Sequence, residues 1–246
     1  MKFETLFENR KPLIGMIHTG CMHGEDMLDT AKREIEIYLK YGVYPLIGNY
    51  FGTSADCEKV MVWLQEYHPK AVYGVNILGD PYEAFLLAGA YGAKFIQIDS
   101  VCGHLDPERD EEYAEELKAM RKKTDVVLLG GVRFKYQPVR SNRSQKEDLL
   151  LGKERCDAIV CTGEGTGIST PFKKIEGFKE VIKDVPVIVG AGVSLDTIEE
   201  TFRLADGAIV GSWFKEDHVD TGHVNEDYVR QMVEKIKSHP LLPRTL

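Results

Sequence analysis

The stretch VPVIVGAGVSLDTIEETFRLADGAIVGSWFK, residues 185–215, decides the predicted fold class of this chain. It contains two short apolar runs, which end in loops of small residues at 190–192 and at 211–212, and a helical segment at 195–204 joins them. The last two strands of a (β/α)8 barrel have this pattern when their loops bind phosphate, because glycine lets the backbone approach the anion and main-chain amides point at it. The stretch therefore predicts a barrel and a phosphate ligand together.

The alternation of strand and helix extends over the whole chain. The apolar runs are nearly continuous, which is typical of parallel strands that are covered on both faces. The expected strands are 13–17, 44–47, 71–77, 94–98, 126–129, 158–161, 187–189 and 208–210. The expected helices are 26–41, 55–67, 81–91, 111–122, 145–153, 172–183, 195–204 and 225–237. Eight such units with right-handed crossovers predict an α/β protein with one closed (β/α)8 TIM barrel.

Length and composition agree with one barrel and exclude several classes of protein. The chain has 246 residues, close to the roughly 250 of a typical barrel, so we expect a single domain over 1–246. A net charge of −8 argues against nucleic-acid partners and against acidic membrane surfaces. No apolar run is long enough for membrane insertion, and no signal peptide is evident. The five cysteines form no CxxC pair, so we expect reduced thiols in a cytoplasmic protein.

Polar residues at the ends of the expected strands are the candidates for catalysis, since barrel chemistry lies there. His18 can act as a general acid or base or bind phosphate, and the alternative is a hydrogen-bonded core histidine. Asp99 can act as a base or bind a hydroxyl or a divalent metal, and the alternative is a cap on the next loop. Asn76 and Asn49 can orient a substrate through both donor and acceptor groups, or serve as turn residues.

The candidates for phosphate binding come mainly from the opening stretch. Their glycines have the alternative role of supplying positive φ angles in tight loops. Arg133 and Lys135 would share a face if their strand continued, where they could neutralise an anion, and the alternative is solvated charges. The loop 162–167 lacks the lysine of a P-loop, so we interpret it as a flexible loop whose amides line the pocket. The predicted phosphate-binding residues are Gly190, Ala191, Gly192, Gly211, Ser212, Arg133 and Thr162.

A metal site has weaker support in the sequence. A cluster of His18, His23, Asp99, Cys102 and His104 is conceivable, but its spacing matches no compact ligand motif. We therefore assign no metal ligands and no certain cofactor, and a divalent metal stays an open alternative.

Several segments resemble the BtpA/SgcQ family: 11–18, 74–78, 92–97, 157–163, 189–194 and above all 205–215. The resemblance covers almost the full chain and implies a phosphate-binding (β/α)8 barrel. The family name refers to photosystem I biogenesis, and some relatives lie beside sugar-utilisation genes, so the resemblance implies no one reaction. The chain departs from the family pattern at 19–24, where a proline-rich loop is usual, and at Gly48–Asn49, where an acidic residue usually precedes the asparagine.

Our first hypothesis is an enzyme that acts on a small phosphorylated metabolite, such as a sugar or nucleotide derivative. His18 and Asp99 would be the acid/base pair, and the reaction would be an isomerisation, a lyase reaction or a hydrolysis. A Schiff-base mechanism is less favoured, because Lys135 is the only plausible strand-end lysine in the central strands. The alternatives are a non-catalytic assembly or regulatory factor on the same barrel, and a metal-dependent hydrolase. A homo-oligomer is compatible with all three.

Overall fold

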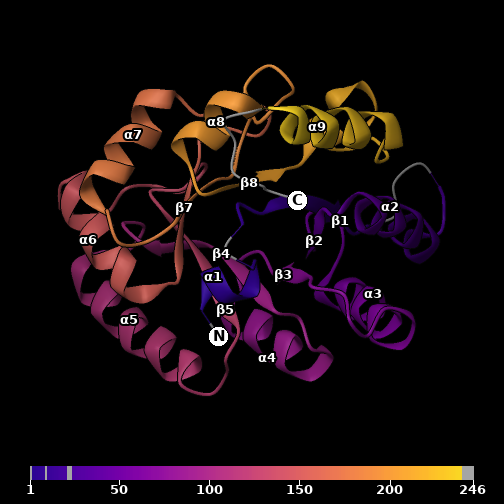
Figure 1. Ribbon diagram of the computed structural model, residues 1–246. Coiled ribbons are helices and arrows are strands. Elements are labelled where there is room, and N and C mark those ends of the chain that lie inside the picture. Colours follow the sequence, from indigo (N-terminus) through magenta and orange to yellow (C-terminus); the bar gives the residue numbers. More distant parts are fainter. Residues whose placement is uncertain (1, 9, 21–23, 240–246) are drawn as a thin grey trace.

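The eight strands found among the described residues close into one parallel barrel in which strand order follows the sequence (Figure 1). The computed structural model describes residues 2–8, 10–20 and 24–239. The closed, parallel arrangement of the strands confirms the predicted (β/α)8 barrel. The strands are β1 (Leu13–His18), β2 (Tyr44–Gly48), β3 (Gly74–Asn76), β4 (Phe95–Cys102), β5 (Val127–Val132), β6 (Ala158–Cys161), β7 (Val187–Val189) and β8 (Gly207–Val210).

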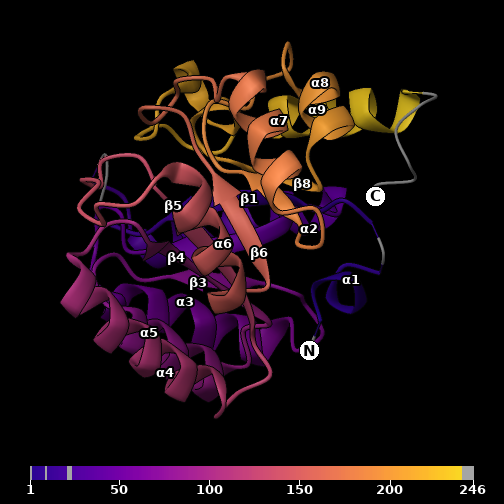
Figure 2. The same ribbon diagram turned by 90° about the vertical axis from the view of Figure 1, so that its left-hand side faces the viewer.

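Helices follow the strands and surround the barrel, as the two perpendicular views show (Figures 1 and 2). The ring consists of α2 (Met27–Tyr41), α3 (Ser54–Tyr67), α4 (Pro81–Tyr91), α5 (Pro107–Arg121), α6 (Gln145–Arg155), α7 (Phe172–Val181), α8 (Ile198–Leu204) and α9 (Glu226–Ser238). Short helices in the described ranges are α1 (Phe3–Leu6), η1 (Ser212–Phe214) and η2 (Glu216–His218), and η1 and η2 lie between β8 and α9.

Local backbone chemistry explains why two helices begin at other residues than the sequence predicts. Helix α5 begins at Pro107 rather than at 111, because proline at the first helical position lacks only an N–H that would be unpaired there. Helix α8 begins at Ile198 rather than at 195. The main-chain N–H of Ser194 donates to Oγ1 of Thr197 at 2.9 Å, so these residues form a turn ahead of the helix.

Apolar side chains form two cores. The inner one fills the barrel with residues such as Ile14, Leu46 and Ile188, and the outer one lies between strands and helices. Helix α1 covers the end of the barrel where the strands begin, at the centre of the ring in Figure 1. The Phe7 ring there lies 5.0 Å from Tyr44 and 5.6 Å from Phe95, centroid to centroid. Helix α1 does not cover the opposite end of the barrel, where the strands finish and where a ligand could bind.

Strands β4 and β5 approach each other closely at that opposite end. A Cβ atom at Gly131 would lie 1.9 Å from the carbonyl oxygen of Asp99, so only glycine fits. The pairing of the two strands is irregular between Ile98 and Cys102. Because β4 is longer than expected, it carries Gln97 and Asp99 to the edge of the barrel.

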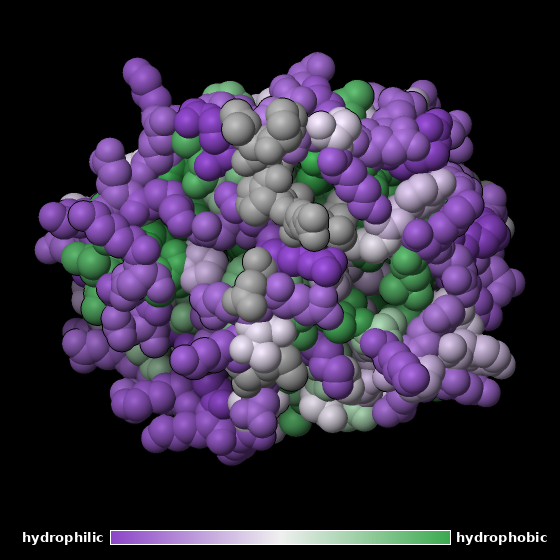
Figure 3. Space-filling model, in the orientation of Figure 1, coloured by the Kyte–Doolittle hydropathy of each residue, from purple (hydrophilic) through white to green (hydrophobic). Residues whose placement is uncertain are grey.

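The face of the molecule seen in Figure 3 is largely hydrophilic, with scattered apolar side chains between polar ones. Among the described residues, no helix is long and apolar enough to cross a membrane.

Candidate functional site

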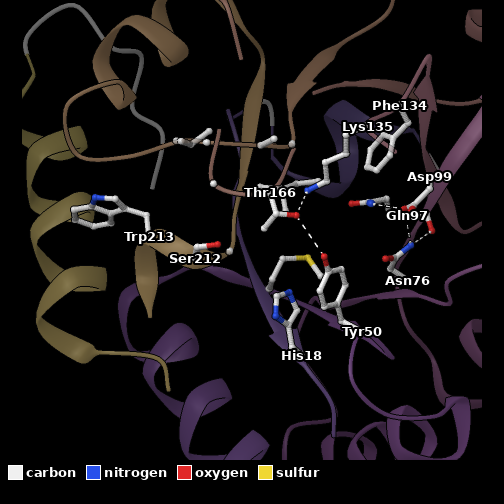
Figure 4. Close-up of a pocket in the computed structure, with 18 of the residues that line it drawn as sticks. His18, Tyr50, Asn76, Gln97, Asp99, Phe134, Lys135, Thr166, Ser212 and Trp213 are labelled. Atoms are coloured by element: carbon white, nitrogen blue, oxygen red, sulfur yellow. Dashed lines mark hydrogen bonds between the residues drawn. The ribbon is translucent and has the colours of Figure 1, made fainter. Parts of the chain in front are cut away.

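A cavity of about 310 Å³ lies at the ends of the strands (Figure 4). Its wall combines residues from β1, β3, β4 and β8 with residues from the loops that follow β2, β5, β6, β7 and β8. The predicted residues that line it are His18, Asn76, Asp99, Gly190, Ala191, Gly192, Gly211 and Ser212. The structure thus brings most of the candidate acid/base and phosphate-binding residues to one cavity.

The carboxylate of Asp99 is held by two neutral amides. Nε2 of Gln97 donates to its Oδ1 at 3.0 Å, and Nδ2 of Asn76 donates to the same oxygen at 3.3 Å. Asn76 is itself fixed, because its Nδ2 also donates to the carbonyl of Gln97 at 2.9 Å. Burial raises the pKa of Asp99, although both amide hydrogen bonds favour the ionised form. This carboxyl group therefore holds a proton more readily than one in water.

His18 lies in contact with a second titratable group, Lys215. Nδ1 of His18 is 3.2 Å from Nζ of Lys215 and 3.0 Å from the carbonyl oxygen of Asp220, to which Lys215 also donates at 2.9 Å. A carbonyl oxygen can only accept and an ammonium group can only donate, so Nδ1 either donates to Asp220 or accepts from Lys215, and the two contacts require different tautomers of the ring. Burial lowers the pKa of His18 to about 3, and the charge of Lys215 adds to this effect. The imidazole is therefore neutral near pH 7, and its ring stacks on Tyr50 with centroids 4.7 Å apart.

The low pKa of His18 predicts a pH dependence of stability. An unfolded histidine has a pKa near 6.5. Between pH 6.5 and about pH 3, the unfolded chain therefore binds a proton at His18 that the folded protein does not bind. The free energy of unfolding should therefore fall as the pH drops through this range, by up to about 1.4 kcal/mol per pH unit from this group. We expect His18→Gln to lose this contribution. Urea unfolding of both proteins across the pH range measures it, and parallel profiles would contradict it.

The loops after β7 and β8 offer main-chain amides to the cavity. Within the described residues, the N–H groups of Gly192, Val193 and Ser212 donate to no protein acceptor. Gly192 has φ +62°, and a Cβ atom there would lie 2.3 Å from the backbone of Ile168. Hydrogen bonds from the loop after β6 accompany this close approach, since Oγ of Ser169 donates to the Gly192 carbonyl at 3.1 Å. The carbonyl is thereby occupied while the amides stay available to a ligand.

Lys135 also lines the cavity, above the carboxylate and the imidazole. Its Nζ donates to Oγ1 of Thr166 at 3.1 Å, and the same hydroxyl is 3.4 Å from the Tyr50 hydroxyl (Figure 4). Burial lowers the pKa of Lys135 more than Tyr136, Asp99 and Asp220 raise it. A partly buried amino group therefore faces the space that a ligand would occupy.

Arg133 does not line the cavity, so the expectation that it shares a face with Lys135 is wrong. Strand β5 ends at Val132, and Arg133 has the left-handed φ of +49°, which turns its side chain away. Its Nε donates to Oδ2 of the fully buried Asp148 at 2.8 Å. Arg143 donates to the other oxygen of that carboxylate at 2.9 Å. Arg133 therefore belongs to a buried network that holds the loop after β5.

Asn49 and Thr162 likewise lie outside the cavity wall. Oδ1 of Asn49 accepts a hydrogen bond from the main-chain N–H of Leu78 at 2.8 Å, which links the ends of β2 and β3. Oγ1 of Thr162 accepts one from the main-chain N–H of Lys135 at 2.9 Å. Both residues hold neighbouring segments in place, and Thr166 of the same loop lines the cavity where Thr162 was expected.

The residues of the conceivable metal cluster do not converge among those described. His18 and Asp99 line the cavity, whereas Sγ of Cys102 lies 3.8 Å from the Asp148 carboxylate and the His104 ring packs on Tyr113. His23 lies outside the described residues. In the described part of the chain, no group of three or more His, Cys, Asp or Glu side chains has the arrangement of a metal site.

Sequence reasoning missed two residues that line the cavity, Tyr50 and Trp213, and the buried contact of Lys215 with His18 beside it. These residues belong to no motif, yet they follow segments that the sequence singled out. Tyr50 comes after Gly48–Asn49, and Trp213 and Lys215 come after Gly211–Ser212. The sequence could have identified these three residues, because each is an aromatic or basic residue next to a predicted strand-end loop.

Comparison with known proteins identifies relatives that match most of this chain. The model of the BtpA family matches residues 9–238. The chain belongs to the BtpA family. An uncharacterized protein of Thermococcus kodakarensis is 31% identical over 93% of this chain and 96% of its own length. The photosystem I biogenesis protein BtpA of Synechocystis is 26% identical over 97% and 93%, and the putative sgc region protein SgcQ of Escherichia coli is 30% identical over 67% and 63%.

Solved structures with the same fold include two enzymes. The tryptophan synthase alpha chain of Legionella pneumophila superimposes with a TM-score of 0.66 at 14% identity, over 97% of this chain and 96% of that one. Phosphoribosyl anthranilate isomerase of Thermus thermophilus superimposes with a TM-score of 0.59 at 14% identity, over 92% and 98%. At 14% identity this structural similarity shows that the BtpA-family chain has the TIM-barrel fold, and it shows nothing about the reaction or the ligand.

Proposed function

We propose that this BtpA-family protein is an enzyme that acts on a small phosphorylated metabolite, such as a sugar or nucleotide derivative. One observation carries the proposal: the amides of Gly192, Val193 and Ser212, which have no protein acceptor in the described part of the chain, line the same cavity as His18 and Asp99. Figure 4 shows Ser212 and Asp99 at opposite ends of this cavity. A dianion bound at the first end would extend the rest of the metabolite toward the second, because amides at such loops attract anions.

The two titratable groups would divide the proton transfers between them. His18 is neutral near pH 7 and can accept a proton, while the raised pKa of Asp99 suits it to donate one. Asn76 and Gln97 would orient the Asp99 carboxyl group through the hydrogen bonds described above. Proton transfer of this kind serves isomerases, lyases and hydrolases alike, so the proposal names the substrate class and not one reaction.

A non-catalytic role is the second candidate, and the name of the Synechocystis relative favours it. An assembly factor could keep the barrel and bind a phosphorylated ligand without converting it. Incubation with each bound compound, followed by phosphorus NMR, separates the two roles. Conversion that disappears in His18→Gln and Asp99→Asn supports the enzyme, and binding without conversion supports the assembly factor.

Thermal unfolding with a panel of metabolites tests the phosphate site. A ligand that binds only the folded state at about 100 times its Kd stabilises it by about 2.7 kcal/mol, which raises Tm by several degrees in a chain of this size. We expect inorganic phosphate and phosphorylated sugars or nucleotides to raise Tm, and the same compounds without phosphate to leave it unchanged. If no phosphorylated compound raised Tm, the proposed ligand class would be wrong.

A further inference from the structure

We propose that the cavity takes a phosphorylated aldehyde or ketone and that Lys135 binds its carbonyl carbon as an imine. The proposal rests on the phosphate site proposed above, which would orient the substrate. Lys135 comes from the loop after β5, and its amine faces the interior of the cavity (Figure 4). A carbonyl compound is the substrate class with which a partly buried amine in the wall of a cavity can react.

The surroundings of Lys135 favour a nucleophile over a structural cation. Its amine has one hydrogen-bond partner among the described side chains, the neutral hydroxyl of Thr166, and no described carboxylate lies within ion-pair distance. Nζ also lies 6.0 Å from the centre of the Phe134 ring, which is itself buried and covers the amine on one side. Desolvation of this kind favours the free amine, which is the form that attacks a carbonyl.

Lys215, a buried lysine beside the cavity, is less suited to this role. Its side chain is 2% exposed, and its Nζ contacts Nδ1 of His18 and the carbonyl oxygen of Asp220. Lys215 does not line the cavity, whereas Lys135 does. A ligand therefore reaches Lys135 first. The charge of Lys215 adds to the effect of burial, which keeps the neighbouring imidazole neutral.

Asp99 completes the chemistry of the step. The free amine of Lys135 attacks the carbonyl carbon, a C–N bond forms, and one amine proton passes to the oxygen. Asp99 supplies the second proton, the C–O bond breaks, and water leaves. The product is a protonated imine, and the carboxylate of Asp99 is left ionised opposite the new positive charge. The balance needs no oxidant, reductant or other reactant.

Reductive trapping tests the proposal. The full-length protein is treated with glyceraldehyde 3-phosphate and sodium borohydride, and the modified lysines are identified by peptide mass spectrometry. We expect a stable secondary amine on Lys135 that forms several-fold faster than on the exposed Lys59 and Lys118. Inorganic phosphate should slow the labelling of Lys135, and glyceraldehyde without phosphate should label it several-fold more slowly.

Two variants separate the imine from a purely electrostatic role. Lys135→Arg keeps the positive charge and Lys135→Met keeps the length of the side chain, and neither can form an imine. In both variants the total labelling by glyceraldehyde 3-phosphate should fall to that of the exposed lysines, and labelling equal to that of the parent would contradict the proposal. Equal labelling of Lys135 and the exposed lysines in the parent would overturn the imine. If phosphate still raised Tm in that case, the proposed function would stand alone. If phosphate had no effect on Tm either, both proposals would fall.

Discussion

Ser212→Asp should reduce phosphate affinity by about a thousandfold. Ser212 lies at the end of the cavity where the amides of the loops after β7 and β8 meet. A carboxylate there would stand about 4 Å from a bound phosphate, and two like charges at that separation repel by about 4 kcal/mol at an effective dielectric constant of 20. Such a loss corresponds to about three orders of magnitude in Kd. Calorimetric titration with inorganic phosphate measures the change.

Ser212→Asn is the matched control for this variant. Asparagine has nearly the same size and shape as aspartate but carries no charge, so it should keep most of the affinity. Equal affinity in Ser212→Asp and in the parent would show that phosphate binds elsewhere. A loss of the same size in both variants would show that the shape of the loop, rather than its charge, decides binding.

Asp148→Ala should destabilise the protein by about 3–5 kcal/mol, because it removes a fully buried carboxylate from between two arginines. Oδ2 of Asp148 accepts hydrogen bonds from Nε of Arg133 at 2.8 Å and from Oγ of Ser141 at 2.9 Å, and Oδ1 accepts one from Arg143. Alanine would leave both guanidinium groups partly buried without this partner. Urea unfolding followed by circular dichroism measures the loss.

Asp184→Ala is the control for the Asp148 variant. Asp184 pairs with Lys153 at 2.9 Å, but its side chain is 67% exposed, and exposed ion pairs contribute about 1 kcal/mol or less. We therefore expect a small change in the free energy of unfolding. Similar losses in the two variants would contradict the stabilising role assigned to the buried network.

The sequence was most informative where a residue's role follows from its place on a strand. The continuous apolar runs and the small-residue loops of 185–215 predict the barrel, and the strand ends predict that His18, Asn76 and Asp99 face one cavity. This inference works because parallel strands all end at the same edge of a closed sheet. It fails one residue beyond a strand, as Arg133 shows, because a single left-handed φ redirects the side chain.

The sequence by itself therefore determined the barrel, the family and the edge at which a site must lie. Only the tertiary structure decided which side chains meet there. Closing the barrel pairs β1 with β8 and brings Lys215 to His18 across 197 positions of sequence. The folding of the loop after β5 pairs Arg133 with Asp148 and leaves Lys135 facing the cavity. Strand order follows from local periodicity, whereas such pairings depend on the path of loops whose conformation is set by buried, long-range contacts.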